Sequence, residues 1–298
     1  MNKKITIIGA GNVGSTIAYT LIANSNVNEI VLIDINKDKS SAEALDLKQA
    51  SPYLSNIDIK SGDYEDSINS DIIVITSGIG RKPGQSRLEL VQKNVDILKN
   101  ITDNIVNLNP NAIYIIVSNP VDILTYFFHN YTSIPKNHII GTGTLLDSMR
   151  FKIKLSEVLN KPANTIDAVV LGEHGDSSVF PWSSINTSLN DLDKKEVEQF
   201  VKNSGAKIIA GKGATFYAIA SAVCEIINCI MLDKNKILPV SVMFNGEYGI
   251  NDVCLGLPCK IGANGLEEKT LLELNEEEKL ALENSANILK NIIKDVKF

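Results

Sequence analysis

Short apolar runs alternate with amphipathic stretches along the first half of the chain. The runs are rich in Ile and Val, which favours strands, and the longer stretches between them have helical periodicity. We expect strands at residues 5–8, 29–34, 71–76, 112–118 and 138–141, with helices at about 12–23, 40–49 and 87–108. Strands that are apolar throughout are typical of a sheet covered on both faces. The pattern therefore predicts an α/β fold with a doubly wound parallel sheet.

The second half of the chain is less regular. We expect helices at about 147–159, 193–210, 212–232 and 275–294, and a strand at 166–171. Residues 238–262 contain Gly-Glu-Tyr-Gly and Gly-Leu-Pro turns, which predict antiparallel hairpins. Repeats and low-complexity linkers are not seen, so we expect two closely packed domains. These are a dinucleotide-binding domain at 1–143 and an α+β substrate domain at 144–298.

Composition narrows the choice of partners. The chain has 29 Lys and Arg against 35 Asp and Glu, a net charge of −6. This argues against nucleic acid or an anionic membrane as a partner. A signal peptide and an apolar window of ~18 residues are both missing, so we expect a cytoplasmic protein. The four cysteines form two C-x4-C pairs, a spacing unlike that of zinc ligands, which predicts buried thiols and no metal.

A glycine-rich turn follows the first predicted strand. In the pattern Gly9-x-Gly11-x-x-Gly14, Gly9 permits the tight turn, Gly11 lets the backbone approach a pyrophosphate, and Gly14 lets the helix pack on the strand. The pyrophosphate binds at the N-terminus of the helix. Asp34 closes the second strand, where a carboxylate accepts hydrogen bonds from ribose hydroxyls and repels a 2′-phosphate. NAD is therefore predicted over NADP; FAD sites share the fingerprint, but the rest of the chain does not support FAD.

Four further segments, at 76–87, 117–122, 141–151 and 171–178, resemble the lactate/malate dehydrogenase family. The resemblance covers almost the whole chain. It implies hydride transfer between NAD and C2 of a small 2-hydroxy acid, in a homotetramer or homodimer. It also implies that the cofactor contacts come from Gly9, Gly11, Asn12, Val13, Gly14, Asp34, Thr76, Ser77, Gly78, Asn94, Val117 and Asn119.

The same resemblance assigns the proton chemistry to His174. Reduction of a 2-keto acid needs a proton at the carbonyl oxygen, and imidazole titrates near neutral pH. Asp147 is its partner, which fixes the tautomer and stabilises the imidazolium; the alternative is that Asp147 caps a helix. Arg150, one helical turn on, binds the substrate carboxylate through two hydrogen bonds. His129 and His138 are expected to be structural.

A lid and two polar residues complete the predicted site. The segment 78–85 holds three glycines and a proline, which is typical of a mobile lid. The resemblance implies that Arg87 swings in with this lid and polarises the substrate carbonyl. It further implies substrate contacts from Asn119 and Thr215.

Arg81 falls at the position that sets substrate preference in this family. Lactate enzymes commonly have glutamine there and malate enzymes arginine, because a second carboxylate buried under a lid needs a counter-charge. We therefore predict malate/oxaloacetate, with lactate/pyruvate or a mixed range as the alternative. Glu173, Thr215 and Trp182 resemble the lactate enzymes instead. A lactate-dehydrogenase-like branch of malate dehydrogenases, however, also combines the arginine with Gly-Glu-His-Gly and Lys-Gly-Ala-Thr, and the chain resembles that branch. The role of Arg81 is lost if its side chain points to solvent.

Two other observations limit the function. Where many bacterial relatives bind an activating sugar bisphosphate, the matching positions are Lys152 and Asp167, and the carboxylate predicts no such activation. A non-enzymatic nucleotide sensor would not need His174, Asp147 and Arg150 together. A 6-phospho-glycosidase on a related NAD fold would need metal-ligating Cys and His residues.

Overall fold

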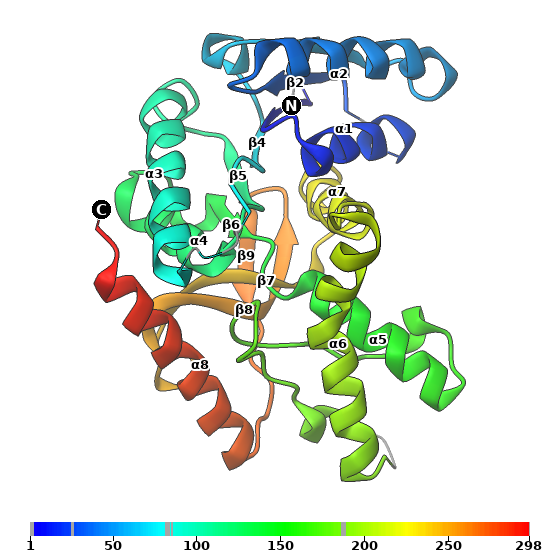
Figure 1. The fold of residues 1–298 in the computed structure, drawn as a ribbon, viewed down its shortest axis with the longest axis vertical. Coiled ribbons are helices and arrows are strands. Elements are labelled where there is room, and N and C mark those ends of the chain that lie inside the picture. Colours follow the sequence, from blue (N-terminus) through cyan, green and yellow to red (C-terminus); the bar gives the residue numbers. More distant parts are fainter. Residues whose placement is uncertain (1–2, 25–26, 81–83, 85, 186–188, 298) are drawn as a thin grey trace.

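The computed structural model describes residues 3–24, 27–80, 84, 86–185 and 189–297 (Figure 1). The strands are β1 (Lys4–Ile8), β2 (Glu29–Ile33), β3 (Asp58–Ser61), β4 (Ile72–Ile75), β5 (Ile113–Ile116), β6 (Ile139–Gly141), β7 (Lys236–Asn245), β8 (Asn251–Gly262) and β9 (Gly265–Lys269). The helices are α1 (Asn12–Asn24), α2 (Lys37–Ala50), α3 (Arg87–Ile105), α4 (Val121–Tyr131), α5 (Leu145–Leu159), α6 (Asp191–Lys212), α7 (Tyr217–Met231) and α8 (Glu276–Asp295).

All the strands belong to one sheet, in the order β3-β2-β1-β4-β5-β6-β7-β8-β9. The pairs from β3 to β6 are parallel, and those from β6 to β9 are antiparallel. The predicted doubly wound parallel sheet and the antiparallel hairpins are therefore confirmed. The structure adds that they are continuous, because Gly141 on β6 pairs with Ser241 on β7. The division of the chain at residue 143 stays a prediction.

The helices bury the two faces of this sheet. The central strands are almost wholly apolar, and β1, β4 and β5 are buried along their whole lengths. Helix α7 packs against α1, and α4 contacts β6, β7 and β8 (Figure 1). A second, smaller core lies around α5 and α6 and includes Phe151, Leu155, Phe180 and Val201. This second core is what holds α5, the helix that carries Asp147, against the rest of the molecule.

Some predicted elements are corrected. Residues 166–171 do not form a strand; only isolated bridges, Leu171 with Val179 and Gly172 with Gly256, occur there. The segment is apolar because it packs into the smaller core, so its composition resembled that of a strand. The short polar strand β3 was missed. Helix α5 begins at Leu145 with Thr144 as its N-cap, so the alternative of Asp147 as the capping residue is wrong.

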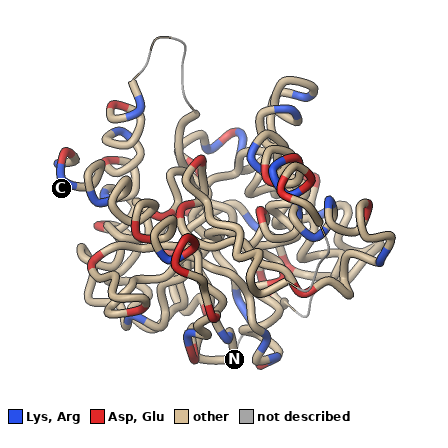
Figure 2. The backbone as a smooth tube through the Cα atoms, turned by 90° about the horizontal axis from the view of Figure 1, so that it is seen from below, with Lys and Arg blue, Asp and Glu red and all other residues tan. Residues whose placement is uncertain are grey.

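Along the backbone, positions of Lys and Arg are interspersed with positions of Asp and Glu in the view of Figure 2. None of the helices in the described parts of the chain is long and apolar enough to cross a membrane. The four cysteines are buried, as expected.

His129 makes stability depend on pH. It lies buried near the end of α4, and neither of its ring nitrogens has a hydrogen-bond partner among the described residues. Burial, with Lys136 and Lys269 nearby, lowers its pKa from 6.5 to about 4. His129 therefore binds a proton below about pH 6.5 in the unfolded chain, but only below about pH 4 in the folded chain. The free energy of unfolding should fall by at most ~3 kcal/mol over this interval.

Urea unfolding at a series of pH values tests this. His129→Leu removes the titrating group, so its stability should change less than that of the wild type between pH 6.5 and 4. Above pH 7.5 both side chains are neutral, and the difference there measures packing alone. Parallel curves for the two proteins would contradict the assignment to His129.

Candidate active site

The glycine-rich turn lies between β1 and α1. Gly9 has a φ of +107°, and its N–H donates to the Ile33 carbonyl at 2.7 Å. A Cβ on Gly14 would lie 1.9 Å from the Gly9 carbonyl oxygen, so only glycine lets α1 start this close to the strand. A Cβ on Gly11 would meet nothing within 4 Å. The open space at Gly11, beside the first turn of α1, fits a pyrophosphate group.

Asp34 stands directly after β2, beside this turn. Its carboxylate accepts hydrogen bonds from the Ala10 N–H at 2.7 Å and the Asn36 N–H at 2.9 Å. A carboxylate has further lone pairs, so these two bonds leave acceptor capacity for ribose hydroxyls. Lys37, the first basic residue after it, pairs instead with Asp63. The arrangement fits NAD, because a cation that would receive a 2′-phosphate is directed elsewhere.

The remaining predicted cofactor residues gather at the ends of β4 and β5. Thr76 donates to the Gly9 carbonyl at 2.9 Å, and Ser77 packs against Gly9. Asn94, on α3, is buried. Its side-chain amide accepts a hydrogen bond from the Ile79 N–H and donates to the carbonyls of Ile79 and Asn119. Asn94 therefore holds these two segments together. The other predicted members, Asn12, Val13, Gly78 and Val117, lie in the first turn of α1 and directly after β4 and β5.

A buried carboxylate joins the predicted catalytic residues. One oxygen of Asp147 contacts Nδ1 of His174, and the other accepts from Nη1 of Arg150 at 2.9 Å. Asp147 and Arg150 lie on the same face of α5, as the spacing predicted. His174 belongs to the turn after Gly172, whose φ of +80° directs the chain towards α5. The three residues are therefore brought together as predicted, with Asp147 at the centre.

This cluster favours the charged states of Asp147 and His174. Burial alone would raise the pKa of Asp147, but His174 and Arg150 outweigh it and hold that pKa below its usual value. Burial alone would also lower the pKa of His174, whereas Asp147 and Asp122 raise it above 6.5. A histidine that keeps its proton near neutral pH, with Nε2 left for a substrate, is suited to proton transfer.

Arg87 begins α3 and forms an ion pair that the sequence did not predict. Its Nη2 lies 2.5 Å from Oε1 of Glu173, the residue before His174. Half of the Arg87 side chain is exposed, whereas Glu173 is buried. The other oxygen of Glu173 accepts from Ser177. The pair thus holds the guanidinium next to the turn that carries His174.

Other predicted substrate residues are not among the contacts described for His174, Asp147 and Arg150. Asn119 follows β5 with its side chain exposed, and Thr215 lies in the short connection between α6 and α7. Arg81 lies outside the described residues. The sequence reasoning missed Asp122, a buried carboxylate that accepts from the His174 N–H at 2.7 Å. Its place three residues after Asn119, in the same segment, was the available signal.

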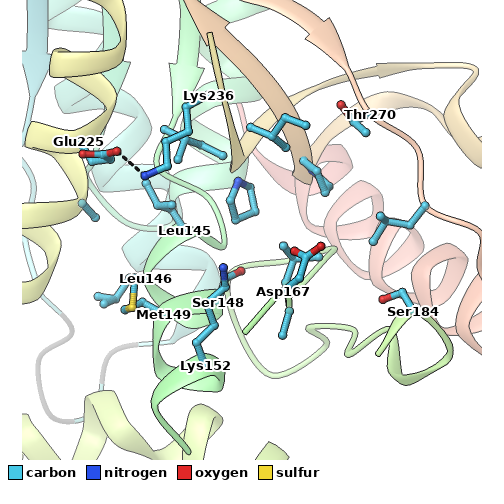
Figure 3. Close-up of a pocket in the computed structure, with 18 of the residues that line it drawn as sticks. Leu145, Leu146, Ser148, Met149, Lys152, Asp167, Ser184, Glu225, Lys236 and Thr270 are labelled. Carbon is cyan, nitrogen blue, oxygen red and sulfur yellow. Dashed lines mark hydrogen bonds and ion pairs between the residues drawn. The ribbon is translucent and has the colours of Figure 1, made fainter. Parts of the chain in front are cut away.

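A cavity of about 720 Å³ lies against another face of α5 (Figure 3). Leu146, Met149 and Lys152 line it from α5, and Asp167 lines it from the following segment. Lys236 there pairs with Glu225 at 2.6 Å. Asp147 and Arg150 thus lie on the face of α5 that meets His174, whereas Lys152 lies on a face that lines this cavity. The predicted lack of activation by a sugar bisphosphate, based on Lys152 and Asp167, stays a prediction.

Two family models together match nearly the whole chain. Residues 3–141 match the lactate/malate dehydrogenase NAD binding domain, and residues 144–298 match the lactate/malate dehydrogenase alpha/beta C-terminal domain. The chain belongs to the lactate/malate dehydrogenase family. As in this family generally, its cofactor is NAD, and the resemblance read from the sequence motifs is confirmed.

Curated relatives in this dehydrogenase family are similar over almost their full lengths. An L-lactate dehydrogenase of Acetivibrio thermocellus is 43% identical, over 98% of this chain and 96% of the relative. One from Clostridium perfringens is 44% identical over the same shares. The crystal structure of a minor L-lactate dehydrogenase from Enterococcus mundtii, in a ligand-bound form, has a TM-score of 0.96 and 34% identity, covering 100% of this chain and 99% of that one. These names do not support the predicted preference for malate.

The glycine positions make a paired prediction for this dehydrogenase. Gly14→Ala should lower Tm strongly, because its Cβ would overlap the Gly9 carbonyl, although alanine normally favours a helix over glycine. Gly11→Ala should leave Tm of the cofactor-free protein nearly unchanged and weaken NADH binding by about tenfold or more, because its Cβ fills space that the pyrophosphate needs. Thermal unfolding and NADH fluorescence titration measure both effects. Undiminished NADH affinity in Gly11→Ala would contradict this placement of the cofactor.

Proposed function

We propose that this NAD-dependent dehydrogenase interconverts pyruvate and L-lactate. The cluster of His174, Asp147 and Arg150 carries the proposal for the reaction, because it joins a proton donor to a cation that can bind a carboxylate. The names of the relatives support lactate as the substrate. A homotetramer or homodimer stays the expected assembly.

His174 is proposed to transfer the proton. The bound cofactor supplies the hydride to C2 or receives it from C2. His174 gives its Nε2 proton to the carbonyl oxygen during reduction and takes it back from the hydroxyl during oxidation. Asp147 on Nδ1 holds the imidazole in one orientation and stabilises its charged form.

The arginines are proposed to bind and polarise the substrate. Arg150 has N–H groups beyond the Nη1 that contacts Asp147, and these bind the substrate carboxylate. Arg87 polarises the carbonyl, since its ion pair with Glu173 keeps it beside His174. Asn119 and Thr215 add hydrogen bonds to the substrate.

A second candidate substrate, oxaloacetate, rests on Arg81. The chain has only three arginines among its 29 basic residues, and all three, Arg81, Arg87 and Arg150, fall in the predicted substrate site. All the other basic residues of the chain are lysines. Arginine at position 81 would suit planar, bidentate recognition of a second substrate carboxylate.

A comparison of kcat/KM for pyruvate and oxaloacetate with NADH tests the substrate. We expect pyruvate to be preferred by about tenfold or more. Arg81→Gln should increase that preference, because it removes a cation that pyruvate leaves unpaired. Lys82→Gln is the matched control, since it removes the same charge from the adjacent position and should leave the ratio unchanged. A tenfold or greater preference for oxaloacetate would replace lactate with malate and leave the reaction class intact.

Asp147→Asn tests the proton chemistry. The pKa of His174 should fall, because the charge that raises it is lost. Reduction needs protonated His174, so the pH at which kcat/KM for the 2-keto acid declines should move lower. At neutral pH kcat should fall by up to about ten-thousandfold, the loss seen when a triad carboxylate is neutralised. NADH affinity serves as the control and should stay near that of the wild type. A variant with an unaltered pH profile would exclude His174 as the proton donor that Asp147 supports.

A further inference from the structure

A second carboxylate, Asp122, contacts the main chain of His174, whereas Asp147 contacts its ring. It is the second residue of α4 and only 3% of its surface is exposed. Oδ2 accepts a hydrogen bond from the main-chain N–H of His174 at 2.7 Å, and Oδ1 accepts one from Oγ of Ser241 at 2.5 Å. Both hydrogen-bond donors are neutral, so they offset the cost of burying this carboxylate less fully than a cation in contact with it would.

Asp122 joins three parts of the molecule. Helix α4 starts two residues after Asn119, at the end of the parallel strands, and Ser241 belongs to β7 in the antiparallel part. Ser241 is also the residue through which β7 pairs with Gly141 on β6. The backbone is closely packed there, since a Cβ on Gly143 would lie 2.3 Å from the Ser241 nitrogen. Ser241 is therefore a fixed anchor from which Asp122 reaches the catalytic turn.

We propose that Asp122 is a positioning residue, which holds the main chain of His174 in place and adds a second negative charge beside its imidazole. Asp147 orients the ring from Nδ1, whereas Asp122 fixes the backbone from which the ring extends. The inference rests on the proposed role of His174 in proton transfer and assigns a second carboxylate to the same reaction.

The charges around His174 agree with this role. Asp147 and Arg150 face it from α5 and Asp122 from α4, while Glu173 is paired with Arg87. Asp147 contributes most to the raised pKa of His174 against burial, and Asp122 adds to it.

Asp122 itself is ionised at neutral pH. Burial, with Glu173, raises its pKa to about 6, although Ser241 and His174 favour the charged form. The Cys254 thiol, on β8, stays protonated, because burial and then Asp122 raise its pKa. Above pH 6, Asp122 therefore keeps its negative charge and helps His174 to keep its proton.

Asp122→Asn separates charge from geometry. The amide oxygen can still accept from the His174 N–H and the amide nitrogen can donate to Ser241, so the contacts survive while the charge is lost. NMR titration of the imidazole signals measures the pKa of His174 directly, without turnover. The chain has only three histidines, so His129 and His138 serve as internal references. We expect the His174 midpoint to fall by about half to one pH unit, and the other two to stay unchanged.

Kinetics test the positioning role with the 2-keto acid that the wild type reduces best. Asp122→Ala leaves the His174 N–H without its acceptor, so kcat should fall by about tenfold or more while KM and NADH affinity change little. Asp252→Asn is the matched control, since it removes the same charge from a carboxylate that accepts from Tyr126 and not from His174. It should leave the His174 midpoint within about 0.2 pH unit of the wild type.

An unchanged His174 midpoint in Asp122→Asn would overturn the proposal. So would an equal change in Asp252→Asn, which would trace the effect to the net charge of the protein and not to the contact between Asp122 and His174. Because the NMR titration needs no substrate, an error in the proposed substrate would leave this result readable. If the midpoint falls in Asp122→Asn while the wild type reduces none of the 2-keto acids, the proposed function fails and the contact with Asp122 stands.

Discussion

A single buried carboxylate, Asp147, is the interaction on which the active site depends. An ionised carboxylate inside a protein is tolerated only when charged or hydrogen-bonding partners surround it. Here His174 and Arg150 supply that compensation, one at each oxygen. Helix α5 must therefore lie at a fixed distance from the turn of His174, and the small core around Phe151 and Phe180 maintains that distance. The carboxylate in return raises the pKa of His174 and holds the guanidinium of Arg150 at 2.9 Å, as the roles proposed for these two residues require.

The continuous sheet brings the two halves of the chain to this point. The carboxyl ends of β1, β2, β4 and β5 carry the predicted cofactor residues, at the edge where ligands bind in doubly wound sheets. The antiparallel strands extend the same sheet through Gly141 and Ser241, and Ser241 contacts Asp122. Gly172 pairs with Gly256 on β8, which holds the start of the catalytic turn. The cofactor side and the proton donor are thus fixed to one framework rather than to two domains that move independently.

Arginine and lysine have separate tasks in this protein. Lysines form the described ion pairs away from the site, as in Lys236 with Glu225 and Lys269 with Glu247, where a flexible point charge is sufficient. Arg87 and Arg150 pair with Glu173 and Asp147 close to His174, where a planar guanidinium can bind one carboxylate and still present N–H groups to another. The pairing has a physical consequence, because a substrate carboxylate has to share these arginines with carboxylates of the protein.

The sequence by itself determined the parallel strands, the glycine-rich turn and the roles predicted for His174, Asp147 and Arg150. Periodicity and short motifs are local properties, so they can be read along the chain. Tertiary structure alone decided that the hairpins join the parallel sheet, that residues 166–171 pack as an irregular segment, and that Arg87 pairs with Glu173. It also decided that Asp122 meets His174, 52 residues away. Such contacts depend on which segments, distant in the sequence, pack against each other in the folded protein. The local pattern of residues does not specify that packing.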